Sequence, residues 1–156
     1  MNWAHLHVAL NHIPVLGTLL VLVLLCAAML RRSDELKKVC LWAFVVLALL
    51  TILIKFTGDF AAESVTLADW FSEPIVAAHE EAANQATTGL FVVGLLAAGG
   101  LFVVHKVRSV PRWLLGSLFL TAFVVFLFLA RAANLGGRIR HSEIRPAPAA
   151  ESVTSP

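Results

Sequence analysis

The chain has 156 residues, of which 59% are hydrophobic and 14% are charged, and its formal net charge is +2. Soluble domains are about 45–50% apolar and about 25% charged, and a soluble chain of this length must cover a large surface with polar residues. The composition argues against a soluble enzyme, a disordered region and a nucleic-acid-binding protein. It predicts an all-α bundle of helices that contacts a lipid bilayer.

Four apolar stretches predict a four-transmembrane-helix bundle. They cover about residues 13–30, 39–55, 86–104 and 113–130, and each is near the roughly 20 residues that a crossing needs. The third helix is expected to begin near Ser72 and to run to about Val107. A capping-box pattern from Thr66 to Asp69 predicts a short interfacial helix before it. Residues 1–145 thus form one membrane domain without an internal repeat, and 146–156 form a disordered tail.

Basic residues gather in two of the links between these helices. They are Arg31, Arg32, Lys37, Lys38, Lys106, Arg108 and Arg112. Basic loops remain on the cytoplasmic side, so we expect a multi-pass protein of the bacterial inner membrane with both termini in the periplasm. Cys26 and Cys40 fall near the cytoplasmic ends of their helices, where a reducing compartment disfavours a disulfide.

Five of the six histidines fall in the predicted periplasmic layer: His5, His7, His12, His79 and His141. A single interfacial histidine commonly only forms hydrogen bonds with water or a neighbouring helix, and we interpret His7 and the cytoplasmic His105 in that way. Polar groups at membrane depth are otherwise functional candidates. The remaining four histidines are therefore predicted metal ligands.

Imidazole ligands suit haem iron, and also copper, zinc or non-haem iron. Pairing of His12 with His79, and of His5 with His141, would hold one or two haem b groups, with Arg138 and Arg140 beside the propionates. A compact metal site would instead combine the histidines with Glu80 or Glu143. No CxxCH motif is present, which excludes covalent haem attachment. The residues Lys55, Asp59 and Glu63 form either a salt-bridged ladder or a proton exit beside a quinol site.

The motifs together resemble a known family. They are His5…Asn11-His12-Ile13-Pro14, Thr57-Gly58-Asp59, His79, and Asn134-Leu135-Gly136-Gly137…His141. This set is similar to a bacterial family of small four-helix inner-membrane proteins of unknown function that are thought to bind b-type haem. The resemblance implies roles for His12, His79 and His141, with Gly136 and Gly137 shaping the cofactor site.

These observations lead to one expected function and two alternatives. The expectation is a cytochrome b-like electron-transfer protein or subunit rather than a stand-alone enzyme. It would exchange electrons with quinone, a membrane redox complex or a periplasmic electron carrier, and it would not bind nucleic acid. The alternatives are a histidine-based metal-binding membrane protein and a non-catalytic accessory subunit of a larger membrane complex.

Overall fold

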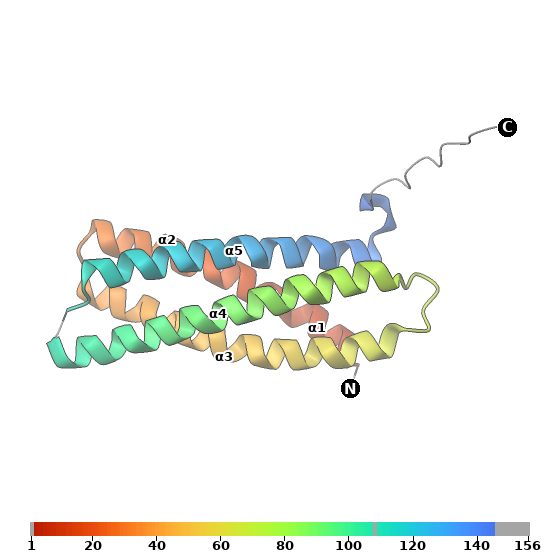
Figure 1. Ribbon diagram of the computed structural model, residues 1–156, viewed down its shortest axis with the longest axis horizontal. Coiled ribbons are helices and arrows are strands. Elements are labelled where there is room, and N and C mark those ends of the chain that lie inside the picture. The colour runs from red at the N-terminus through yellow and green to blue at the C-terminus, as the bar shows by residue number, and fades with distance from the viewer. Residues whose placement is uncertain (1, 108, 146–156) are drawn as a thin grey trace.

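The computed structural model describes residues 2–107 and 109–145, so Arg108 and the predicted tail lie outside the described residues. Its elements are α1 (Trp3–Leu10), α2 (His12–Leu30), α3 (Asp34–Val65), α4 (Glu73–Val107), α5 (Arg112–Arg140) and the short 3-10 helix η1 (Ser142–Ile144). Helices α1 and α2 follow one another as the first of four long rods packed side by side (Figure 1). The four rods are long and apolar enough to cross a membrane, which confirms the predicted all-α class and helix number.

The first rod is interrupted at Asn11, between α1 and α2. Pro14 lies in the first turn of α2 and lacks a backbone N–H, and its ring would crowd the carbonyl of Leu10. A proline is tolerated in the first turn of a helix but not in its interior. The chain therefore ends one helix at Leu10 and starts a new one at His12.

The link between α2 and α3 is built from residues that stop one helix and start the next. Arg32 takes a left-handed conformation with φ of 53°, and the N–H of Ser33 donates to the carbonyl of Ala28, as in a Schellman cap. The Ser33 hydroxyl then accepts the N–H of Leu36 and caps α3. This link lies at the opposite end of the bundle from the N-terminus (Figure 1).

Helices α3 and α5 are longer than the apolar stretches that predict them, and they extend to Val65 and Arg140. Gly58 stays helical, and Lys55 and Asp59 form an ion pair at 2.9 Å one turn apart. This pair supports the ladder interpretation, because such pairs stabilise a helix outside the apolar region. Hydropathy locates the part of a helix that suits lipid, but it does not show where the helix ends.

The predicted interfacial helix after α3 is wrong. The segment 66–72 forms only turns between α3 and α4. The Thr66 hydroxyl donates backwards to the carbonyl of Glu63 instead of capping a new helix. Because α3 continues to Val65 and α4 begins at Glu73, too few residues remain between them for a separate helix. The predicted start of the third long helix near Ser72 is confirmed.

The interior is filled by apolar side chains from the inward faces of α2, α3, α4 and α5, with Leu25, Phe44, Leu90 and Leu118 fully buried. Helices α3 and α4 approach closely at Gly94, where an added Cβ would lie 2.5 Å from the Cβ of Ala48. Small residues at such crossings are typical of membrane helices. Cys26 and Cys40 are both free thiols.

Candidate functional site

Five histidines belong to segments at one end of the bundle, which we call the histidine end. It contains α1, the start of α2, the start of α4, the end of α5 and η1, together with the 66–72 link (Figure 1). His105 lies in the last turn of α4 at the opposite end. The structure thus keeps the layer that the sequence predicts, and the contacts of each histidine decide its chemistry.

His79 is half-buried on α4 and is fixed by α5. Its Nδ1 lies 2.9 Å from the carbonyl oxygen of Ala132. A carbonyl only accepts hydrogen bonds, so Nδ1 carries the proton and Nε2 of the neutral ring keeps its lone pair. Within the described part of the chain, no residue forms a hydrogen bond with Nε2. An imidazole oriented in this way is typical of a metal ligand.

His7 is also half-buried, and it is fixed by α3. Its Nδ1 lies 3.3 Å from the carbonyl oxygen of Ile54 and 3.2 Å from Oγ1 of Thr57. The Thr57 hydroxyl donates to the same carbonyl at 2.7 Å. The proton of the imidazole therefore lies on Nδ1 and points to both oxygens, which leaves Nε2 as an acceptor. His7 could not be singled out from the sequence, because its partners on α3 are distant in the chain.

Glycines allow both imidazoles to reach these carbonyls. A Cβ at Gly136 would lie 3.1 Å from Cε1 of His79, and a Cβ at Gly58 would lie 2.9 Å from Cε1 of His7. Each glycine stands four residues after the residue whose carbonyl accepts, so it lies directly beside that carbonyl on the helix surface. The Gly-Gly motif after the fourth predicted helix thus includes one glycine that contacts a histidine. The other, Gly137, faces Ile144 at 3.7 Å.

The other three predicted histidine ligands are exposed. His5 and His12 lie on the surface of α1 and α2. His141 follows α5, and its Nδ1 forms a hydrogen bond with the Glu143 carboxylate at 2.9 Å. That hydrogen bond and the backbone N–H of Glu143 lower the pKa of the Glu143 carboxyl below its ordinary value of 4.5, with the backbone bond contributing more.

Arginines hold the end of α5 against the 66–72 link. The Arg140 guanidinium lies 4.5 Å from the centre of the Trp70 ring, a cation–π contact. Arg145 donates to the carbonyls of Arg138, Ile139 and Trp70. In the described chain, the buried Nε of Arg138 has no hydrogen-bond partner. Arg140 is therefore engaged within the protein, whereas Arg138 keeps a donor for an anionic group.

The compact metal site is not assembled by these side chains. Among residues 2–107 and 109–145, no three histidine, cysteine, aspartate or glutamate side chains gather as ligands of a metal ion. Haem takes only two protein ligands, so it needs no such group.

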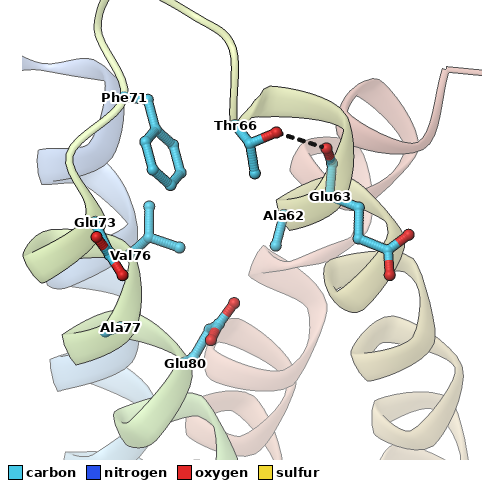
Figure 2. Close-up of a pocket in the computed structure, with 8 residues that line it drawn as sticks. All are labelled: Ala62, Glu63, Thr66, Phe71, Glu73, Val76, Ala77 and Glu80. Carbon is cyan, nitrogen blue, oxygen red and sulfur yellow. Dashed lines mark hydrogen bonds between the residues drawn. The ribbon is translucent and has the colours of Figure 1, made fainter.

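An open pocket of about 300 Å³ lies between the end of α3 and the start of α4. Its walls are Ala62, Glu63, Thr66, Phe71, Glu73, Val76, Ala77 and Glu80. The carboxylate of Glu80 points into the space between the two helices, whereas that of Glu63 points away (Figure 2). The pocket contains none of the predicted histidines, because His79 faces α5 from a different side of α4.

Comparisons of the chain with protein-family profiles, with curated proteins and with solved structures find no match.

Proposed function

We propose that this protein is a membrane electron-transfer subunit that holds haem b at the histidine end of its bundle. The observation that carries the proposal is the state of His79, whose Nδ1 proton is held by the Ala132 carbonyl at 2.9 Å while Nε2 is left as a ligand. A backbone acceptor on the far nitrogen fixes the tautomer and raises the basicity of the ligand. When bound, haem supplies the one-electron oxidation and reduction.

The surrounding residues suit this cofactor. Gly136 lets the imidazole of His79 lie against α5, and the unpartnered Nε of Arg138 can donate to a propionate. Gly137 is one position away near the end of α5, where an added Cβ would lie 3.7 Å from Ile144. His5, His12 and His141 are exposed and stay weaker candidates for a second haem or for a copper, zinc or non-haem iron site.

The chain would accept and release electrons through partners at the same end. If the histidine end faces the periplasm, three kinds of partner would reach it: quinone in the bilayer, a membrane redox complex or a periplasmic carrier. The basic links at the opposite end favour that orientation in a bacterial inner membrane. Alkaline phosphatase fused to the C-terminus is expected to be active. If that fusion is inactive and a phosphatase fused into the link between α2 and α3 is active, the histidine end faces the cytoplasm instead.

An absorbance spectrum of the full-length protein tests the function. Protein purified from haem-replete cells should show a Soret band, and a pyridine haemochrome assay should identify protohaem. His79→Ala should lose the low-spin spectrum, whereas His105→Ala at the opposite end should keep it. A well-expressed wild-type protein without a Soret band would exclude haem. Stoichiometric copper, zinc or iron without porphyrin would favour the metal-binding alternative.

A further inference from the structure

The bundle consists of two helical hairpins with the same histidine arrangement. The first hairpin covers α1 to α3 (residues 3–65), and the second covers α4 and α5 (residues 73–140). In each hairpin, Nδ1 of a histidine on the first rod donates to a backbone carbonyl on the second rod. The imidazole ring lies over the glycine that follows the accepting residue by four positions. The equivalent residues are His7, Ile54 and Gly58 in the first hairpin, and His79, Ala132 and Gly136 in the second.

A second contact repeats deeper in each hairpin. A glycine stands ten positions after each histidine (17 − 7 and 89 − 79). A Cβ at Gly17 would lie 2.6 Å from a methyl group of Leu47, and a Cβ at Gly89 would lie 2.7 Å from one of Val125. Leu47 and Val125 each precede the accepting residue by seven positions (54 − 47 and 132 − 125). Equivalent residues of the two hairpins are therefore separated by 72 positions along the first rods (79 − 7 and 89 − 17) and by 78 positions along the second rods (132 − 54 and 125 − 47).

Burial follows the same offsets. Each buried residue of α2 has a buried counterpart 72 positions later in α4 (79 − 7). The pairs are Pro14 and Ala86, Thr18 and Leu90, Val21 and Val93, Leu22 and Gly94, Leu25 and Ala97, and Ala28 and Gly100. Buried residues define the inner face of a helix. The first rods of the two hairpins therefore turn equivalent positions, 72 residues apart, toward the interior.

This correspondence gives the bundle an internal two-fold relation. Both first rods begin at the histidine end and run in the same direction (Figure 1), so the axis that relates the hairpins follows the bundle. In transporters that are built from parallel repeats, the ligand site lies at the interface of the repeats. The only histidine of the first hairpin with a histidine counterpart is His7, because the counterparts of His5 and His12 are Ala77 and Asn84.

We propose that His7 is the second axial ligand of the haem held by His79. The inference rests on the proposed function and names the residue that completes its site. Haem iron takes two protein ligands at most, and His7 and His79, which occupy equivalent places in the two hairpins, would be these two. Each ring has its Nδ1 proton bound by a backbone carbonyl, and each keeps Nε2 for the metal.

The proposal replaces the pairing of His12 with His79 that the sequence predicts. Electron paramagnetic resonance and absorbance spectra of full-length His7→Ala, His79→Ala and His12→Ala protein test it. We expect the first two variants to convert low-spin haem to high-spin or to lose it, and His12→Ala to keep the wild-type spectrum. Added imidazole should restore the low-spin signal in the two ligand variants, which a variant that merely misfolds would not show.

The possible results separate the two proposals. Wild-type protein without haem would overturn the proposed function and this inference with it. Haem that stays low-spin in His7→Ala, and is lost or becomes high-spin in His12→Ala, would overturn the inference alone. Should His7→Ala fail to accumulate, Gly58→Ala displaces the same ring, and Gly116→Ala, where a Cβ meets open space, serves as its control. An unchanged low-spin spectrum in Gly58→Ala would also count against His7.

Discussion

The two hairpins share an inner face, but the two helix contacts between them differ, and so do the surroundings of each histidine. Helices α3 and α4 meet through Ala48 and Gly94, whereas the equivalent positions on α5 and α2 hold Phe126 and Leu22. His7 has a threonine hydroxyl beside it, whereas the equivalent position near His79 is Leu135. The repeated features position the imidazoles, and the differences make the two sides of the bundle inequivalent.

The close approach of α3 and α4 should be the most sensitive feature to a single methyl group. Gly94→Ala places a Cβ 2.5 Å from that of Ala48, and neither group can rotate away. The helices must separate, and we expect the free energy of unfolding to fall by about 1–3 kcal/mol. A denaturant titration in detergent measures it. Gly99→Ala, where a Cβ meets nothing within 4 Å, should leave the free energy of unfolding unchanged. Equal effects at both positions would contradict a close contact.

The equivalence of the two histidines can be tested at their glycines. Gly58→Ala and Gly136→Ala each push an imidazole away from its carbonyl, with Cβ to Cε1 distances of 2.9 and 3.1 Å. Loss of such an outer contact typically lowers metal affinity about 10–100-fold, and we expect that range for haem retention in both variants. Titration of the apoprotein with haem measures it. An effect at Gly136 alone would mean that only the second hairpin supplies a ligand.

The threonine beside His7 should adjust the haem potential. Thr57→Val removes an acceptor from Nδ1, so the imidazole donates less electron density and the potential rises. A hydrogen bond worth about 0.5–1.5 kcal/mol corresponds to about 20–65 mV for one electron. Leu135→Thr, the mirror change beside His79, should lower the potential. Thr51→Val is the control, because that hydroxyl bonds the Leu47 carbonyl and no histidine. Redox titration of each variant checks the signs.

We expect the smallest effect in the segment after α5, where a hydrogen bond between His141 and Glu143 stabilises η1. This segment has no counterpart in the first hairpin. The pKa of Glu143 lies below 4.5 because its backbone N–H and His141 bind the carboxylate. The pair therefore stabilises η1 at neutral pH, and this contribution is lost as the pH falls from about 4.5 through the lowered pKa. In an NMR titration, His141→Ala should raise the pKa of Glu143 toward 4.5. The haem spectrum of that variant should be unchanged, and a lost Soret band would instead return His141 to the ligand set.

The sequence singled out both His79 and Gly136, and the structure places them in contact, whereas their roles stay predictions. In the first hairpin, the sequence did not single out His7 as a ligand. Helical spacing predicts that His5 and His12 share a face of the first helix, but it does not show that this face is exposed. The internal repeat was also missed, because equivalent positions share burial on the inner face but neither residue type nor residue size. Thr18 and Leu90 are both buried, for example, although one is polar.

The sequence by itself determined the all-helical class, the four apolar rods and the layer in which five histidines lie. Length, hydropathy and charge are local properties, so they can be determined without knowing which helices are neighbours. Only the tertiary structure decided which imidazoles are held and which are exposed. A carbonyl on α3 and another on α5 bind their histidines through space, and glycines 51 and 57 residues away in the chain (58 − 7 and 136 − 79) make room for them.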